Sequence, residues 1–221
     1  MFPWEPLALS LQIATAATLV AGVLGVAIAT WLANSRASWR DLVDVAVTAP
    51  LVLPPTVLGY YLLVLLGRRS ALGHAVEAVF GAPIVFTRAG AVVAALVGSL
   101  PFVVKTARAA LEGVDRTFCQ AARTLGAGAL RAFFTVQLPL ARRGIVAALM
   151  LAFARCLGDF GITLMVAGNI PGETQTASLA IYDAIQEHQE ATASKLAAAL
   201  AVTAVVILYA VNRLTAAEHD S

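Results

Sequence analysis

Long apolar runs separated by short polar stretches dominate the pattern of this chain. A helix needs about 20 mostly apolar residues to cross the hydrocarbon core of a bilayer. Five runs reach that length, at residues 8–32, 45–66, 89–109, 144–167 and 195–214. The alternation typical of outer-membrane barrel strands is absent from them, and unpaired backbone groups are costly in lipid, so each run should be helical. The pattern predicts a single transmembrane domain over residues 1–221, an all-α polytopic membrane protein with five spans, and it leaves room for a sixth short helix.

Composition supports this prediction. Of 221 residues, 60% are hydrophobic and 13% charged, and the mean hydropathy is +0.83, which is far more apolar than a water-soluble domain requires. The net charge of +2 is too small to indicate a nucleic-acid partner. Cys119 and Cys156 form no metal or disulfide motif, so no metal or cofactor is expected. Residues 1–10 carry no Lys or Arg, which argues against a cleaved signal peptide.

Basic residues near the ends of the runs are unevenly distributed, and this asymmetry predicts an orientation. If the N-terminus is outside, ten basic residues fall in inner loops: Arg36, Arg40, Lys105, Arg108, Arg116, Arg123, Arg131, Arg142, Arg143 and Arg213. Four fall in outer loops: Arg68, Arg69, Arg88 and Lys195. The excess predicts an outer N-terminus and a cytoplasmic C-terminus, with residues 105–143 in the cytoplasm and 168–193 facing outward.

Two runs differ from plain membrane helices. The second contains Pro50, Pro54 and Pro55, which break the backbone hydrogen-bond ladder in mid-membrane. Such a break is either a packed kink or a broken helix lining a substrate path. The fourth run places Arg155 and Asp159 near the bilayer centre, four residues apart on one helical face, so we expect either a self-neutralising pair or a functional one.

Several kinds of chemistry are missing from the sequence. ATP hydrolysis would require a phosphate-binding loop ending in Gly-Lys-Ser/Thr, but Val104 precedes Lys105 and Ser194 precedes Lys195. An intramembrane protease would require a buried Ser and His, or two buried Asp residues, and neither set is present. We therefore expect no enzyme, and any ATP hydrolysis belongs to a partner.

A motif with fixed spacing lies between the third and fourth runs. It begins with Gln120-Ala121-Ala122 and reaches Gly126 after three residues; nine residues later follows Val136-Gln137-Leu138-Pro139. This pattern resembles the EAA loop of bacterial ABC-importer permeases, with Gln120 in place of the usual Glu and Val136 in place of the usual Ile. The resemblance implies an ABC-importer permease (MetI-like) fold in which a loop at about 112–140 couples to an ATPase.

The residue types of this loop also have a physical reading. Small Ala121 and Ala122 and a flexible Gly126 allow a short helix and a turn to approach another surface closely, and Pro139 limits or starts the next helix. The alternative is an amphipathic helix lying on the membrane. Its support comes from the basic and aromatic residues Arg123, Arg131, Phe133 and Phe134.

Three further segments narrow the resemblance to one branch of that family. Residues 50–59, 158–161 and 168–176 resemble the permease subunits that import molybdate, although Asp159 stands where those commonly have Glu. Relatives for sulfate and tungstate share much of the pattern, so these oxyanions remain alternatives. The resemblance implies a permease homodimer in the bacterial cytoplasmic membrane, two cytoplasmic ATPase subunits and an external substrate-binding protein.

A dianion crosses the low-dielectric membrane core only if polar groups compensate for the water that it loses. Weak polar contacts serve this purpose better than a strong, fixed anion-binding site. Candidate pathway or gate residues are Pro54, Pro55, Thr56, Arg155, Asp159, Thr163, Asn169, Thr174, Gln175 and Thr176. For any single Ser or Thr, a bond to the preceding helical turn is the simpler explanation. Residues 169–176 are expected to act as an outer gate or binding-protein contact. A passive channel or scaffold and a membrane-embedded enzyme are the competing functions.

Overall fold

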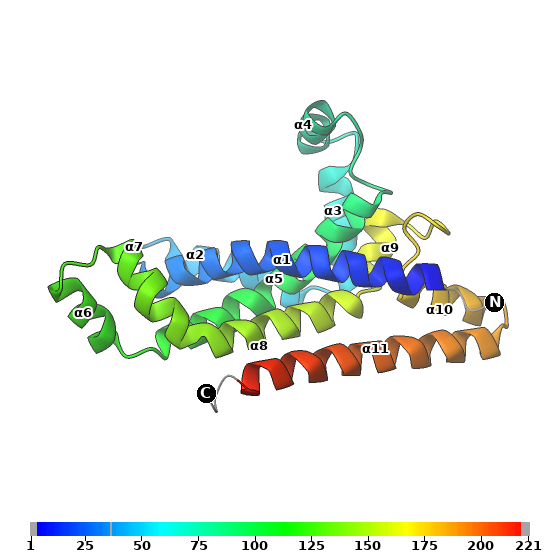
Figure 1. The fold of residues 1–221 in the computed structure, drawn as a ribbon. Helices are drawn as coiled ribbons and strands as arrows, with labels where there is room; N and C mark the ends of the chain where they lie inside the picture. The colour runs from blue at the N-terminus through cyan, green and yellow to red at the C-terminus, as the bar shows by residue number, and fades with distance from the viewer. Residues whose placement is uncertain (1–3, 36, 218–221) are drawn as a thin grey trace.

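Helices arranged lengthwise form the body of the molecule. The structure is a computed structural model that describes residues 4–35 and 37–217, and every regular element in that part of the chain is helical. Helices α1 (Trp4–Asn34), α5 (Arg88–Glu112) and α8 (Leu138–Leu157) pack against one another, and α11 (Glu190–Ala217) runs alongside α8 (Figure 1). The predicted all-α fold is confirmed.

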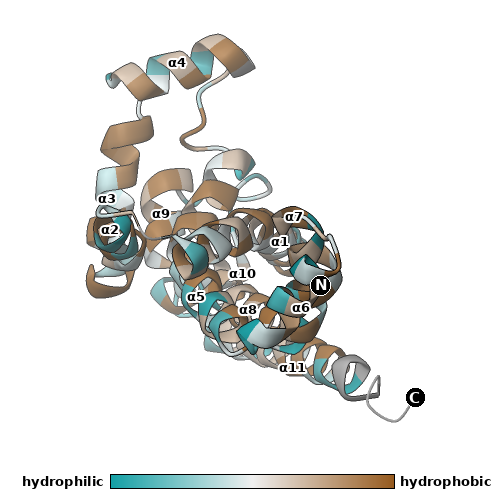
Figure 2. Ribbon diagram, turned by 90° about the vertical axis from the view of Figure 1, so that its left-hand side faces the viewer, coloured by the Kyte–Doolittle hydropathy of each residue, from teal (hydrophilic) through white to brown (hydrophobic). Residues whose placement is uncertain are grey.

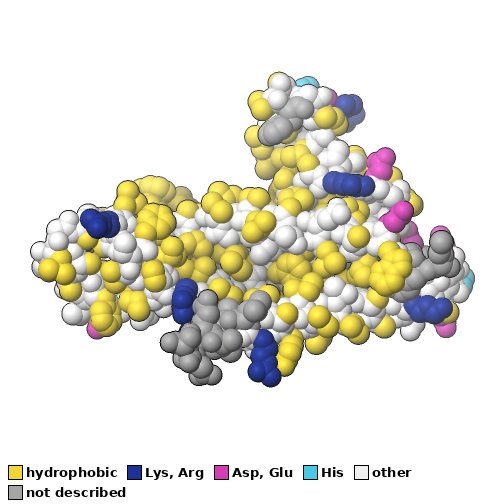
Figure 3. Space-filling model, viewed as in Figure 1, with side chains coloured by type: hydrophobic (Ala, Val, Ile, Leu, Met, Phe, Trp, Pro, Cys, Tyr) yellow, Lys and Arg dark blue, Asp and Glu magenta, His cyan; other side chains and the backbone are white. Residues whose placement is uncertain are grey.

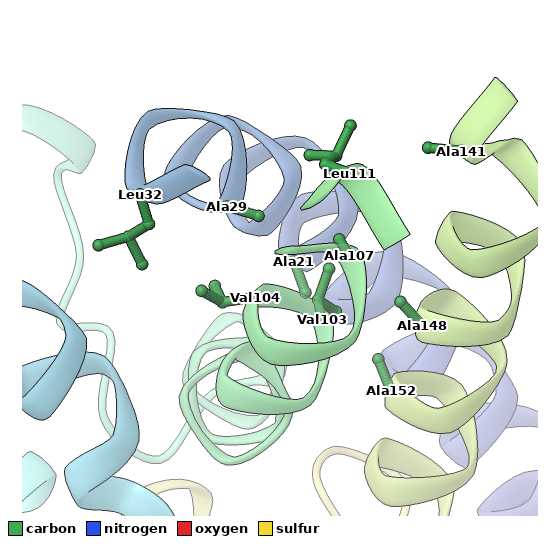
Figure 4. Packing of buried hydrophobic residues seen from close by; sticks show 10 residues of the cluster. All are labelled: Ala21, Ala29, Leu32, Val103, Val104, Ala107, Leu111, Ala141, Ala148 and Ala152. Carbon is green, nitrogen blue, oxygen red and sulfur yellow. The ribbon is translucent and has the colours of Figure 1, made fainter. Parts of the chain in front are cut away.

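Small side chains bring the core helices together. The largest buried cluster contains Ala21 and Ala29 from α1, Val103 and Ala107 from α5, and Ala148 from α8 (Figure 4). Between helices in lipid, small residues allow close backbone approach and strengthen van der Waals packing. Where α1 crosses α5, a Cβ on Gly25 would lie 2.7 Å from Val103 Cγ1, so only glycine fits there.

Three of the predicted spans are single long helices. By length and hydropathy, α1, α5 and residues Glu190–Arg213 of α11 are each sufficient to cross a membrane, and the count rises to five if each of two bent helix pairs is one span. These helices contain the apolar runs predicted at 8–32, 89–109 and 195–214. Apolar side chains are spread along the length of the bundle's surface, as Figure 3 shows.

The second apolar run is broken at its prolines, as predicted. Helix α2 (Arg40–Val52) ends before Pro54, helix α3 (Pro55–Leu66) begins at Pro55, and the two are bent by 118°. Helix α2 lies along the bundle, whereas α3 leads away from it towards the short helix α4 (Ala71–Phe80) (Figure 1). Pro50 is accommodated inside α2.

The fourth run is also broken, and the prediction of one continuous helix over 144–167 is wrong. Helix α8 ends at Leu157, helix α9 (Gly161–Ala167) follows, and the helical stretch beginning at Ala129 is bent by 62° relative to α9. Gly158 and Gly161 flank the break. Asp159 therefore lies between two helices, and Arg155 and Asp159 do not share a helical face.

The remaining short helices lie near the ends of the bundle. Helices α6 (Arg116–Thr124) and α7 (Ala129–Ala132) and a π-helical turn, η1 (Phe133–Gln137), connect α5 to α8 at one end. Helix α10 (Ala177–Gln186) lies at the other end, near the start of α1 (Figure 1). The hydropathy colours of Figure 2 mark hydrophilic residues in α6 and mainly hydrophobic residues in α3.

Candidate coupling segment and translocation pathway

The 112–140 segment forms a helix, a turn and a second helix beyond the end of the bundle. Asp115 begins α6 by accepting hydrogen bonds from the backbone N–H of Thr117 (2.8 Å) and from its hydroxyl (2.7 Å). These bonds favour the carboxylate and hold the pKa of Asp115 below its ordinary value. An anionic N-cap also complements the helix dipole, so the start of α6 is well specified by its sequence.

Gly126 lies just after the end of α6 and turns the chain. Its φ is +89°, in the left-handed region. The N–H of Gly126 donates to the carbonyl of Arg123, and the N–H of Ala127 donates to that of Ala122, both at 3.0 Å. This pair of bonds is a Schellman motif, which turns the chain sharply after a helix. A Cβ on Gly126 would meet nothing within 4 Å in this chain, so the position is open to a partner.

The outer face of this segment is exposed and partly apolar. No residue of α6 is buried; Gln120 and Ala121 are exposed and Ala122 is half-buried. Leu125 has 89% of its surface exposed, and Phe118 and Leu130 are also exposed. Large apolar side chains on a polar helix and turn are typical of a surface that another protein covers.

The second half of the motif returns the chain to the bundle. Val136 and Gln137 lie in η1, and the Gln137 amide donates to the Leu111 carbonyl of α5 at 3.3 Å. Leu138 and Pro139 follow in the first turn of α8, at the point where the π-helical turn passes into regular α-helix. The helical stretch from Ala129 to Leu157 is continuous there, so the segment is attached directly to a membrane helix.

The breaks in the two bent spans lie next to each other. A Cβ on Gly161, at the start of α9, would lie 3.0 Å from the Pro55 side chain and 3.3 Å from the Thr56 backbone nitrogen. The structure thus brings Pro55 and Thr56 next to the segment that holds Asp159 and Thr163. On the opposite side of this junction, Pro54, Pro55 and Thr56 are exposed in the single chain.

Asp159 organises the break between α8 and α9. Its Oδ1 accepts from Arg155 Nη1 at 2.9 Å, and its Oδ2 accepts from the Thr163 N–H (2.9 Å) and hydroxyl (2.7 Å). Its backbone carbonyl accepts from the Ser178 hydroxyl of α10 at 2.9 Å. Arg155 and Asp159 thus form an ion pair within the chain, and the two charges neutralise each other.

The other candidate pathway residues lie apart, in the loop between α9 and α10. Asn169 and Gln175 each donate an amide hydrogen bond to the Asp183 carboxylate, at 2.7 and 2.8 Å. The buried Thr174 hydroxyl accepts from the Ile170 N–H. Thr176 is buried at the start of α10. The structure therefore separates the predicted residues into a junction group and an outer-loop group.

Two residues that hold this loop were missed in the sequence. Arg88, which opens α5, donates from Nε to the Glu173 carbonyl and from Nη2 to the Gly172 carbonyl, both at 3.0 Å. Asp183, on α10, accepts the hydrogen bonds from the side-chain amides of Asn169 and Gln175. Its signal in the sequence is a lone carboxylate within the apolar stretch of α10, whereas backbone carbonyls as partners of Arg88 have no sequence signal. A cavity of about 950 Å³ lies between the start of α1 and this loop.

Comparison with known proteins identifies the family. Residues 21–217 match the family described as binding-protein-dependent transport system inner membrane component. The chain belongs to this family. Membership makes it a multi-pass inner-membrane permease of an ABC transporter, and it implies partners that bind substrate and hydrolyse ATP.

Relatives within this family are similar over most of their length. The permease is 46% identical to the molybdenum transport system permease protein of Escherichia coli K12 over 183 residues, covering 83% of this chain and 80% of that one. It is 40% identical to that of Azotobacter vinelandii over 202 residues, 91% and 89% of the two chains. The sulfate transport system permease protein of Salmonella typhimurium is 34% identical over 205 residues, 93% and 74% of the two.

Solved structures confirm the fold of the permease. A bacterial ABC transporter that imports the acidic polysaccharide alginate superimposes with a TM-score of 0.78 at 15% identity, covering 95% of this chain and 77% of that one. An inward-facing methionine ABC transporter gives 0.74 at 19% identity, covering 97% and 93%. The predicted ABC-importer permease fold is confirmed by these likenesses.

Proposed function

We propose that this chain is the permease subunit of an ATP-driven importer of molybdate. The observation that supports molybdate as the cargo is the identity of 46% and 40% to the molybdenum transport permeases of Escherichia coli and Azotobacter vinelandii, against 34% to the sulfate permease of Salmonella typhimurium. Tungstate and sulfate are the alternative cargoes, since both are tetrahedral oxyanions with the same charge as molybdate; tungstate also matches molybdate in size, whereas sulfate is smaller. Selectivity then belongs mainly to the substrate-binding protein.

The assembly that fits this function contains two copies of the chain, two cytoplasmic ATPase subunits and an external binding protein. The exposed α6, with Leu125 and Gly126 at its end, supplies a docking surface of the kind an ATPase cleft would cover. The loop at 168–176 and the adjacent cavity lie at the opposite end of the bundle, where a binding protein would deliver its cargo. We assign the N-terminus to the outside and the 112–140 segment to the cytoplasm.

The proposed pathway passes the junction of the two broken spans. Its polar groups include the exposed Thr56 and the guanidinium of Arg155, of which 27% of the side-chain surface is exposed. Because Asp159 neutralises Arg155, a passing dianion meets weak contacts and no deep electrostatic trap. That balance suits transport, in which the site must release its cargo as readily as it receives it.

The experiment is uptake into vesicles that contain the permease and its ATPase, with the binding protein outside. We expect molybdate uptake that requires both ATP and the binding protein, and we expect tungstate to compete more strongly than sulfate. Flux without ATP would indicate a passive channel. Efficient uptake of sulfate with no uptake of molybdate would contradict the cargo assignment while leaving the family intact.

A further inference from the structure

A polar cavity lies beneath the coupling helix α6, apart from the proposed pathway. It measures about 510 Å³ and lies between the end of α1, the start of α2, the end of α5 and α6. Its lining includes Asn34, Arg40, Glu112, Arg116, Cys119 and Arg123. The motif residue Gln120 also contributes to its wall, so this cavity adjoins the segment that contacts the ATPase in the proposed function.

The cavity carries an excess of positive charge. Its one acidic lining residue, Glu112, is shared between Arg40 (3.5 Å) and Arg108 (2.8 Å). Within residues 4–35 and 37–217, neither Arg116 nor Arg123 forms an ion pair. Both guanidinium groups are therefore available to an anion, and guanidinium geometry suits the paired oxygens of a phosphate.

Aromatic residues mark the depth of this cavity relative to the membrane. Trp31, in the last turns of α1, contacts Trp39, just before α2, with ring centroids 4.6 Å apart and the ring planes tilted by 36°. Trp39 is exposed by 56% of its surface. Tryptophan is enriched where the hydrocarbon core meets the headgroups. Since Asn34 and Arg40 lie within a few residues of these rings, the cavity opens at headgroup level.

We propose that this cavity binds the phosphate of an anionic phospholipid headgroup through Arg116 and Arg123. Basic pockets between membrane helices at this level are suited to anionic headgroups. The lipid is favoured over a free phosphate ion because its acyl chains lie beside the exposed Trp39 while the phosphate reaches the arginines. Helix α6 packs mainly on η1 and α7, so a headgroup beneath it would brace the coupling helix against the ends of α1 and α5. The inference does not depend on the cargo.

Cys119 provides a reporter within the cavity wall. It is half-buried, whereas the other cysteine, Cys156, is buried in the core. The full chain is placed in nanodiscs of phosphatidylcholine alone or mixed with phosphatidylglycerol, and modification of Cys119 by the uncharged reagent N-ethylmaleimide is followed by mass spectrometry. We expect phosphatidylglycerol to slow the modification several-fold. Inorganic phosphate is added to the phosphatidylcholine discs as a separate arm, and we expect no slowing there.

An anionic membrane surface attracts protons and lowers the reactive thiolate fraction of any cysteine near it. Charge-matched variants therefore distinguish headgroup binding in the cavity from this general effect. The variant R116Q/R123Q should lose the protection, whereas R131Q/R143Q, with the same charge change outside the cavity, should keep it. Native mass spectrometry of the wild-type chain should show retained phosphatidylglycerol. Slowing by inorganic phosphate alone would assign the site to a free oxyanion and overturn the lipid as ligand. Equal slowing in both variants, or none in the wild type, would overturn the site.

Discussion

At the scale of single residues, Asp159 has more partners than any other carboxylate near the junction. Its side chain is 2% exposed, and both oxygens are occupied by Arg155 and Thr163. Breaking a buried ion pair by removing one partner leaves an uncompensated charge, which costs about 3–5 kcal/mol. The same carboxylate satisfies an N–H at the start of α9, so its role is both electrostatic and structural.

We therefore expect Asp159→Ala to lower thermal stability strongly and to abolish uptake. Thr163→Val, which removes one hydroxyl donor and keeps the ion pair, should cost about 1.5–3 kcal/mol. The double variant that replaces Arg155 and Asp159 by apolar residues should be more stable than Asp159→Ala, because no charge is stranded. Thermal unfolding in detergent measures all three. Equal stability of Asp159→Ala and wild type would contradict the pairing as a stabilising contact.

Gly126 tests the coupling segment at the same scale. A non-glycine residue at positive φ costs about 1 kcal/mol, and asparagine tolerates this region better than others. Because no atom of this chain lies near a Cβ there, Gly126→Asn should keep the turn, whereas Gly126→Leu adds bulk where the ATPase would lie. We expect Leu to abolish co-purification of the ATPase and stimulated ATP hydrolysis, with normal membrane insertion. Retention of both by the Leu variant would contradict docking at this turn.

At the scale of elements, α2 is attached to the bundle by ion pairs as well as by the partly buried Val43 and Val47, which pack against the core. It has no buried residue, and Asp44 accepts from Lys105 Nζ on α5 at 2.8 and 2.9 Å and lies 3.4 Å from Arg108. The C-terminal end of α2 lies at the break in the second span, next to the proposed pathway. The ion-pair network at this position therefore contributes to how firmly the first half of a broken span is attached.

Asp44→Asn should loosen α2 selectively. If these ion pairs contribute about 1–2 kcal/mol, the open population of α2 rises about 5–30-fold. Hydrogen exchange of the nanodisc-embedded chain measures this, and the increase should be confined to residues 40–52. Asp41→Asn is the matched control, since Asp41 is exposed on the same helix and forms no ion pair within the described chain. Unchanged exchange in Asp44→Asn would show that apolar contacts hold α2.

The elements differ in how far the sequence predicts them. Long apolar runs determine spans, and consecutive prolines determine a break, so α1, α5, α11 and the break at Pro54 were predictable. The break after Leu157 was missed because Gly158 and Gly161 are tolerated in membrane helices and interrupt no apolar run. The 118° direction of α3 was not predictable either, because a break specifies where a helix stops and tertiary packing specifies where the next one points.

At the scale of the whole molecule, the two ends of the bundle carry different surfaces. One end has the Schellman turn at Gly126 and the cationic cavity, and the other has the loop at 168–176 clamped by Arg88. The motif spacing predicted a short helix followed by a turn at the first end, because helix ends follow local rules, but it did not predict the cavity. The clamp depends on residues more than 80 positions apart, so only the folded chain brings it together.

The orientation of these two ends in the membrane is testable with single cysteines. Ser38 lies in the link between α1 and α2, and Glu173 lies in the loop before α10; both are exposed. In a chain with Cys119 and Cys156 replaced, we expect an impermeant thiol reagent to label Glu173→Cys in intact cells and Ser38→Cys only after permeabilisation. The reason is the excess of Lys and Arg on the Ser38 side, which favours retention in the cytoplasm. Labelling of both sites after permeabilisation is the control for accessibility. Labelling of Ser38→Cys from outside would reverse the orientation and place the coupling segment out of reach of a cytoplasmic ATPase.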